Sequence, residues 1–304
     1  MSLLIVGTVA FDEVESPFGK TGKILGGAGT YIGLAASHLT EKIGIVSVVG
    51  GDFPQEYLNL FKERHIDTSG LRIVKEGKTF FWAGRYHENM NMRDTLVTDL
   101  NVLADFDPVV PEHLRSSKYL MLGNLTPAIQ KRVIEQMDPR PELIVMDTMN
   151  FWMDTALKDL VDVISMVDVL TINDEEARQL SGEYSLNKAA GKILSLGPRY
   201  LIVKKGEHGA LLFHEDKIFH APAMPLDEVF DPTGAGDTFA GGFIGYIAKT
   251  GDVSFENMKR AIIFGSAMAS FTVEKFGTDR LTELSEQDIR KRLQEFVDLV
   301  AFEI

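Results

Sequence analysis

Short runs of apolar, β-branched residues alternate with helix-like segments along most of this chain, and this alternation constrains the fold more than any other feature. The runs are Leu3–Gly7, Gly44–Val49, Tyr119–Leu122, Leu143–Asp147, Val167–Ile172 and Tyr200–Lys204. The helix-like segments are Ala28–Leu39, Gln55–Arg64, Pro127–Met137, Asp174–Leu180, Asn187–Leu196, Asp237–Thr250, Phe255–Glu274 and Ser285–Phe302. Continuous apolar strands that alternate with helices are typical of a parallel sheet covered on both faces. We therefore expect an α/β fold with a doubly wound, mostly parallel sheet and helices on both faces.

One stretch interrupts the alternation. Lys78–Tyr86 and Thr95–Leu103 are strand-like and flank the polar loop His87–Asp94. They predict a small antiparallel β lid inserted at about residues 75–104, to which residues 13–24 can contribute. An ordinary surface hairpin is the alternative. No repeat or linker divides the chain, so we expect residues 1–304 to form a single domain.

The charge balance limits the partners. The chain has 31 Lys and Arg against 44 Asp and Glu, a net charge of −13, which disfavours nucleic acid and anionic membranes as partners. The absence of cysteine excludes disulfides, thiolate zinc sites and cysteine nucleophiles. The seven histidines show no metal-ligand spacing. Without a secretory signal or a long apolar segment, we expect a cytoplasmic protein.

The most informative segment is Phe230–Thr250, where an apolar helix is expected to begin just after Gly234-Ala235-Gly236. Glycines let a ligand approach the backbone, and the first amides of a helix carry partial positive charge, so the segment predicts an anion hole for phosphate. Asp237 lies beside it and can accept a proton from an attacking hydroxyl. We expect the helix terminus to keep Asp237 ionised at neutral pH. The alternative is a strand-to-helix turn in which Asp237 only complements the helix dipole.

These residues carry a resemblance. DPTGAGDTFAGGF resembles the C-terminal signature of the ribokinase-like (PfkB-type) carbohydrate kinases, whose D-T-x-G-A-G-D pattern contains the catalytic aspartate, with Pro232 in place of the usual Thr. The resemblance implies an ATP- and Mg²⁺-dependent kinase that phosphorylates a hydroxyl of a small sugar or polyol. Asp237 would be its general base, with Gly234, Ala235 and Gly236 as the anion hole. It also implies a monovalent-cation site, with K⁺ as the candidate, near Asp231 and Thr233.

The residues that resemble the family's substrate-binding motifs lie near the N-terminus. Gly26 and Gly27, in the run Gly26-Gly27-Ala28-Gly29, resemble the family's first glycine motif, and Asp12 matches its hydroxyl-binding aspartate. A carboxylate can accept hydrogen bonds from two neighbouring hydroxyls. Asp12 as a simple turn residue is the alternative. A dinucleotide fingerprint is disfavoured, because the pattern is not G-x-G-x-x-G and lies far from the first strand.

Two segments resemble the family's nucleotide-binding motifs. Asn173 and Glu176, in NDEE, match the family's N-x-x-E, which organises magnesium and phosphate waters; a capping box is the alternative, and both can hold at once. Gly206 and Gly209, in KKGEHGA, resemble the nucleotide-binding loop. Lys204, where the family often has Thr or Ser, can reach the triphosphate or lie on a solvated face.

The acceptor site departs from the family pattern. Tyr31 replaces a frequent sugar-binding Asn, and its ring can stack on a ring-shaped substrate or fill part of the pocket. Asn124 aligns with a position that often holds a substrate-binding acid. Asp147 and Asn150 follow a predicted strand, at the edge where open α/β sheets bind ligands. We therefore place all four among the substrate-binding candidates.

The hairpin's aromatic residues Phe80, Phe81 and Trp82, with Arg85, can line the pocket or form a homodimer interface, since lids of this family often dimerise. Alternation places Phe81 and Arg85 on one face and Trp82 on the other. Two further functions stay open: a nucleoside kinase of the same family, favoured by Tyr31 and the aromatic lid, and a catalytically silent sugar- or nucleotide-binding protein.

Overall fold

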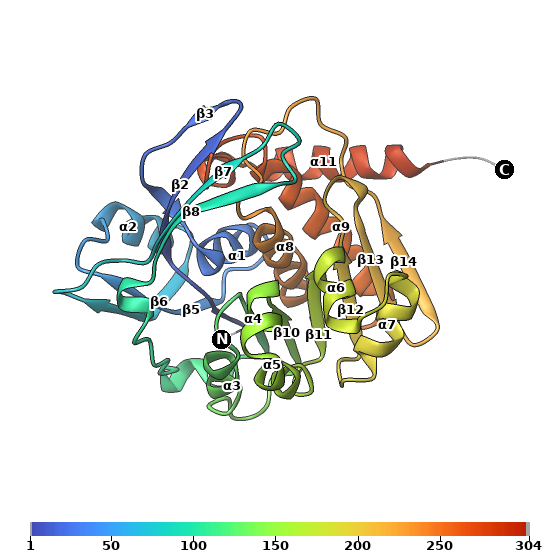
Figure 1. Ribbon diagram of the computed structural model, residues 1–304, viewed down its shortest axis with the longest axis horizontal. Helices are drawn as coiled ribbons and strands as arrows, with labels where there is room; N and C mark the ends of the chain where they lie inside the picture. Colours follow the sequence, from blue (N-terminus) through green and yellow to red (C-terminus); the bar gives the residue numbers. More distant parts are fainter. Residues whose placement is uncertain (1, 302–304) are drawn as a thin grey trace.

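The computed structural model describes residues 2–301 and contains a nine-stranded sheet of order β14-β13-β12-β11-β10-β9-β1-β5-β6 (Figure 1). The parallel strands are β1 (Leu3–Val6), β5 (Ile43–Gly50), β6 (Ile66–Val74), β9 (Tyr119–Leu122), β10 (Leu143–Asp147), β11 (Val169–Asn173) and β12 (Tyr200–Lys204). At one edge, β13 (Ala210–His214) and β14 (Lys217–Ala221) continue the sheet antiparallel. The mostly parallel sheet is therefore confirmed.

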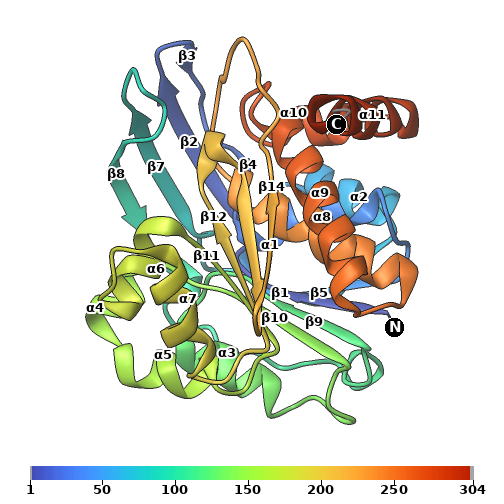
Figure 2. The same cartoon turned by 90° about the vertical axis from the view of Figure 1, so that its right-hand side faces the viewer.

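Helices cover both faces of this sheet, as the edge-on view in Figure 2 shows. One layer contains α1 (Ala28–Ser37), α2 (Gln55–Glu63), α8 (Ala235–Thr250) and α9 (Phe255–Thr272), with α10 (Asp279–Glu283) and α11 (Glu286–Val300) outside them. The other contains α3 (Pro127–Ile134), α4 (Asn150–Thr155), α5 (Leu157–Ile164), α6 (Asp174–Ser181) and α7 (Leu186–Leu194). Within residues 2–301, no helix is both long and apolar enough to cross a membrane.

The two helical layers explain why the strands are apolar throughout. Along β1, Leu3 and Ile5 pack into the core under α1 and α8, whereas Leu4 and Val6 pack into the core under α3 and α5. Successive side chains of a strand point to opposite faces, so a strand with a core on each side has no polar position.

A second sheet projects from the carboxyl edge of the first and forms the lid (Figure 2). Its strands are β2 (Ala10–Ser16), β3 (Gly19–Lys20), β4 (Ile24–Gly26), β7 (Phe81–Tyr86) and β8 (Arg93–Asp99). The pair β7–β8 is the predicted antiparallel hairpin. The sheet is larger than expected, because β2 pairs in parallel with β7 and brings Asp12 into the lid. Asp12 therefore lies within a strand and is not a turn residue.

Several helices and strands do not show the sequence patterns from which the other elements were predicted. β6 is an edge strand with mixed exposure, and the hairpin β13–β14 exposes part of one face, so neither has a continuous apolar run. The two short helices α4 and α5 meet at Ala156, which interrupts their common helical pattern. These edge and surface elements do not alter the predicted topology of the central strands.

Candidate active site

Polar side chains stand at the carboxyl ends of three neighbouring strands, with Asp147 on β10, Asn173 on β11 and Lys204 on β12. Lys204 Nζ donates to Asp147 Oδ2 at 2.7 Å, and Asp147 Oδ1 accepts the N–H of Thr148 at 2.7 Å. The side chain of Lys204 is only 17% exposed. A solvated face for Lys204 is therefore wrong. Asp147, expected at the acceptor, has its carboxylate bound to a lysine on the nucleotide side.

Lys204 keeps its charge in this setting. Burial disfavours the ammonium, but the carboxylates of Asp147 and Glu176 outweigh it and raise the pKa of Lys204. The ammonium also lies against Gly236, since a Cβ on that glycine would be 3.2 Å from Nζ. A permanent cation therefore stands directly beside the predicted anion hole.

Asn173 and Glu176 cap the start of α6. Asn173 Oδ1 accepts the N–H of Glu176 at 2.7 Å, and Glu176 Oε2 accepts the N–H of Asn173 at 2.7 Å. The capping box is thus confirmed, and it leaves further lone pairs on both side chains for water. Burial and then the charge of Asp147 raise the pKa of Glu176 to about 7. The amide oxygen of Asn173 and the carboxylate of Glu176 are oxygen groups, which suit a magnesium ion bound through water.

The turn before α8 is fixed by Asp231, which is 1% exposed. Its Oδ1 accepts the N–H of Thr233 at 2.8 Å, and its Oδ2 accepts the N–H of Gly277 at 2.9 Å. Gly234 follows at a φ of 72°, a left-handed conformation that turns the chain into the helix. Within residues 2–301, no group of three or more acidic or histidine side chains forms a metal site. The two hydrogen bonds that Asp231 accepts hold the turn before α8 in place.

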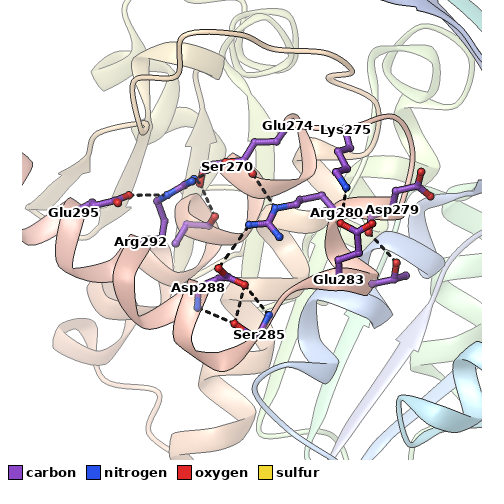
Figure 3. A network of polar contacts seen from close by, with 12 residues as sticks. Ser270, Glu274, Lys275, Asp279, Arg280, Glu283, Ser285, Asp288, Arg292 and Glu295 are labelled. Atoms are coloured by element: carbon purple, nitrogen blue, oxygen red, sulfur yellow. Dashed lines mark hydrogen bonds and ion pairs between the residues drawn. The ribbon is translucent and has the colours of Figure 1, made fainter.

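The loop that carries Gly277 is held by a network of ion pairs shown in Figure 3. Glu274, just after α9, accepts from Arg280 of α10 at 2.9 Å and from Arg292 of α11 at 2.6 Å. Both arginine side chains are largely buried, with exposures of 20% and 12%. The two outer helices α10 and α11 thus hold the segment that contains Gly277, whose N–H donates to Asp231.

Asp237 lies in the first turn of α8, beside unpaired amides. The N–H groups of Gly236 and Asp237 have no backbone acceptor within residues 2–301, whereas the N–H of Ala235 donates to the carbonyl of Pro232 at 3.1 Å. Of the predicted anion-hole residues, Gly236 has a free amide, as does Asp237, whereas the amide of Ala235 is not free. This arrangement is suited to holding phosphate oxygens.

The pKa of Asp237 is raised to about 7, mainly by burial and then by the charge of Asp147, while Lys204 and Arg93 oppose the rise. The expectation of an aspartate fully ionised at neutral pH is therefore wrong for the ligand-free protein. Burial outweighs the helix terminus here. A carboxylate with this pKa is a stronger base than an exposed aspartate.

Asp12 and the first glycines form the other end of the site. Asp12 is 5% exposed and its carboxylate rests on Gly26, where a Cβ would collide with it. The N–H of Gly27 donates to it, and burial, with further contributions from Asp231 and Asp237, raises its pKa to about 7. The charges of Asp231 and Asp237 act on Asp12, so the structure brings these carboxylates of β2 and α8 together at one site.

Tyr31 does not line the site. Its side chain is 1% exposed, and its ring packs behind Gly234, where a Cβ would approach it to 2.5 Å. The hydroxyl is buried without a hydrogen-bond partner among residues 2–301. Stacking of Tyr31 on a substrate is therefore wrong, because no face of the ring is open. Helix α8 crosses over α1 at this point, and the sequence alone does not reveal that crossing.

Asn124 and Asn150 are engaged with their neighbours. Asn124 accepts from the indole N–H of Trp152 at 2.9 Å and donates to Met149 Sδ at 3.0 Å. Asn150 is exposed at the start of α4, where its Oδ1 accepts the N–H of Phe151. Within residues 2–301, neither makes a hydrogen bond to Asp12 or Asp237. Their part in acceptor binding stays a prediction.

A cavity of about 590 Å³ extends from the anion hole. Lys204, Ala235 and Gly236 line its polar end, and Gly206 and Gly209 line its side. The apolar walls include Leu226, Val229, Phe239 and Val273. A polar end with one ammonium group and a mostly apolar body is typical of a cavity that binds a small organic ligand.

The lid closes over both ends of the site. Its tip residues Asn89, Met90 and Asn91 line the same cavity, and Asn91 Nδ2 lies 3.5 Å from Glu207 Oε1 of the nucleotide loop. From β7, the hydroxyl of Tyr86 accepts from Thr233 Oγ1 at 3.2 Å. The inward position of Tyr86 could not be predicted from the sequence, because only the pairing of β7 with β8 shows which side chains face inward.

Trp82 and Arg85 lie on opposite faces of β7, as predicted. Trp82 pairs in register with Asp12, so the two side chains project on the same, inner face. Arg85 lies on the outer face and donates to Glu15 at 2.8 Å. Arg85 therefore does not line the pocket. The inward arginine is Arg93 of β8, which pairs in register with Tyr86 and was missed by sequence reasoning.

Comparison with known proteins identifies the family of this chain. The model of the pfkB family carbohydrate kinases matches residues 5–284. The chain belongs to this family. It is thereby a phosphotransferase with an alcohol group as acceptor, as the glycine-rich signature implied.

Several family members are similar to this chain over most of its length. It is 28% identical to a cytidine kinase of Thermococcus kodakarensis, covering 80% of this chain and 87% of that protein. It is 24% identical to a ribokinase of Staphylococcus aureus, covering 92% and 90%. Among solved structures, a putative ribokinase II of E. coli in complex with ATP and Mg²⁺ superposes with a TM-score of 0.81 at 20% identity, covering 97% and 99%. The ribokinase fold is thus shown.

Proposed function

We propose that this chain transfers the γ-phosphoryl group of ATP to a hydroxyl of a small sugar or polyol. The observation that carries the proposal is the position of Asp237, a partly buried carboxylate beside two free helix amides and the ammonium of Lys204. The amides and the ammonium would hold the phosphoryl oxygens, and Asp237 would take the proton of the acceptor hydroxyl. The E. coli structure, which contains ATP and Mg²⁺, supports this choice of donor.

The remaining polar residues have defined parts in this reaction. Asp12 and Gly27 would hold the acceptor hydroxyls, while Gly206 and Gly209 would border the nucleotide. Asn173 and Glu176 would orient waters of Mg²⁺, an ion that neutralises charge on the phosphates when bound. Each carboxylate oxygen of Asp231 already accepts one backbone hydrogen bond, from Thr233 and from Gly277. A K⁺ site near Asp231 and Thr233 would be built partly from main-chain carbonyls.

A nucleoside is the second candidate acceptor. Trp82 projects on the same face as Asp12 and offers an aromatic surface beside the hydroxyl-binding carboxylate. The similarity to a cytidine kinase points the same way. Phosphate-transfer assays on a panel of sugars, inositols and nucleosides distinguish the candidates. Turnover with nucleosides alone would reject the sugar-kinase assignment.

The general-base role is tested with Asp237→Asn, which keeps the shape of the side chain and removes its basicity. We expect kcat to fall at least about 10²-fold, with the affinity for MgATP retained. The control is Asp298→Asn, on the exposed end of α11, which should behave as the wild type. Unchanged turnover in Asp237→Asn would contradict the role of base. No ATP consumption by the wild type with any acceptor would favour a silent binding protein.

The proposal includes a cytoplasmic homodimer formed through the lid. Strand β8 is the free edge of the lid sheet, and it exposes Leu96 and Val97 to 47% and 37%. An unpaired edge with apolar side chains offers both hydrogen-bonding groups and apolar surface to a second copy.

A further inference from the structure

Arg93 is the inward-facing cation of the lid. It pairs in register with Tyr86 across the β7–β8 hairpin, and directly opposed residues project on the same face. Tyr86 on that face reaches Thr233, in the turn that immediately precedes the anion hole. The guanidinium carbon of Arg93 also lies 5.6 Å from the centre of the Trp82 ring, which faces inward. These contacts place the guanidinium over the site, opposite the start of α8.

The guanidinium is available for a ligand. Within residues 2–301, no carboxylate lies within ion-pair distance of Arg93, whereas Lys204 is already bound to Asp147. Its charge nevertheless acts on three carboxylates from three elements, since it opposes the raised pKa of Asp12, Glu176 and Asp237. The guanidinium contacts the ring of Trp82 and the hydroxyl of Tyr86, and its charge is not neutralised by a carboxylate of the described residues. A cation with this surrounding, which acts on carboxylates of three elements, is positioned for an anionic ligand.

We propose that Arg93 is a catalytic residue that contacts the transferring phosphoryl group from the lid side, opposite the amides of Gly236 and Asp237. This inference rests on the proposed function. Phosphoryl transfer places charge on the three equatorial oxygens of the phosphoryl group, and donors aimed at those oxygens lower the barrier. Lys204 and the helix amides approach from the sheet, and Arg93 approaches from the lid.

The transfer balances without any further reactant. The acceptor oxygen forms a bond to the γ-phosphorus and releases its proton to the carboxylate of Asp237. The bond between the γ-phosphorus and the bridging oxygen breaks, and its electron pair leaves on the β-phosphate of ADP. Arg93 exchanges no proton. It contributes only hydrogen bonds and charge, and it does so only when the lid is closed.

The test uses Arg93→Met, which keeps the length of the side chain and its contact with Trp82. Arg93→Lys retains the charge, and Arg85→Met removes an arginine from the outer face of the same lid. We expect Arg93→Met to lower kcat at least about 10²-fold, with the KM values for ATP and acceptor within about threefold. Arg93→Lys should recover part of this loss, and Arg85→Met should stay within about twofold of the wild type.

A binding measurement separates this inference from the proposed function. Aluminium fluoride with MgADP mimics the phosphoryl group in transfer, so it should increase ADP affinity in the wild type and not in Arg93→Met. This readout needs no acceptor turnover, so it remains decisive if no sugar or nucleoside in the panel is phosphorylated. The role of Arg93 would be overturned by an unchanged kcat in Arg93→Met, or by an effect confined to the KM of the acceptor. It would also be overturned if aluminium fluoride failed to increase ADP affinity in the wild type, or increased it equally in Arg93→Met. Matching thermal unfolding curves exclude misfolding as the cause.

Discussion

Asp12, Glu176 and Asp237 each carry a pKa raised to about 7, in all three cases chiefly by burial. The site thus concentrates carboxyl groups whose ionised forms are unfavourable until a ligand arrives. The charge of Arg93 already opposes the rise at all three carboxyl groups, and a bound magnesium ion would oppose it further. The carboxylates proposed for the chemistry therefore weaken the ligand-free fold, a common cost of functional sites.

This cost predicts a pH dependence of stability. An aspartate that titrates near 3.8 when unfolded and near 7 when folded favours folding fully below about pH 4, and this contribution is lost as the pH rises to 7. The variant Asp12→Asn does not lose this contribution. In the ligand-free protein, its free energy of unfolding should therefore rise relative to that of the wild type, and the difference should grow by about 2 kcal/mol from pH 5 to pH 8. Urea unfolding across this range measures it. Asp298→Asn should follow the wild type, and parallel curves for Asp12→Asn would contradict the expectation.

At the scale of elements, the start of α8 depends on what packs behind it. Gly234 adopts a positive φ and also lies against the ring of Tyr31 in α1. The anion hole is consequently supported by a buried aromatic residue that never meets the ligand. Tyr31, expected in the pocket, instead determines how closely the two helices approach.

Gly234→Ala should therefore destabilise the protein through backbone strain and through collision with Tyr31. Gly182, which ends α6 at a φ of 68° with no heavy atom within 4 Å of its Cβ position, is the matched control. We expect Gly182→Ala to lower the free energy of unfolding by about 1 kcal/mol and Gly234→Ala by about 2 kcal/mol more. Equal losses in thermal or urea unfolding would show that Tyr31 does not restrict this turn.

The sequence predicted local parts of the site better than the distant ones. Asp237, Gly236 and the pair Asn173–Glu176 lie where the sequence predicted, at the starts of two helices, because each set is contiguous or three residues apart. Tyr31 was misplaced and Arg93 was missed, because burial and strand register depend on segments far away in the chain. The central strands could be predicted because their signal is local. A strand that is buried on both faces is a continuous apolar run, which is visible within the strand itself.

At the scale of the whole molecule, a net charge of −13 requires the site to gather its positive potential locally. The main sheet supplies Lys204, α8 supplies amides, and the lid supplies Arg93. These contributions meet only when the second sheet lies over the first. Assembly of the two sheets therefore completes the electrostatics that neither sheet has alone.

The exposed edge of the lid predicts the oligomeric state. Leu96→Glu on β8 should convert a homodimer into a monomer, because it places charges along the paired edges. Ile218→Glu on β14, the edge of the main sheet, is the control, since Ile218 is 53% exposed and lies outside the lid. Sedimentation or light scattering measures the mass of both variants. A monomeric wild type, or a dimer that survives Leu96→Glu, would exclude the lid interface.

The position of Trp82 has one more consequence. The chain contains two tryptophans, and Trp82 stands on the inner face of the lid between Asp12 and the guanidinium of Arg93. A cation near an indole ring and a change of solvent around it both alter indole emission. The molecule thus carries an intrinsic optical label at the point where acceptor, lid and phosphate would meet, and lid closure can be followed in the unlabelled protein in real time.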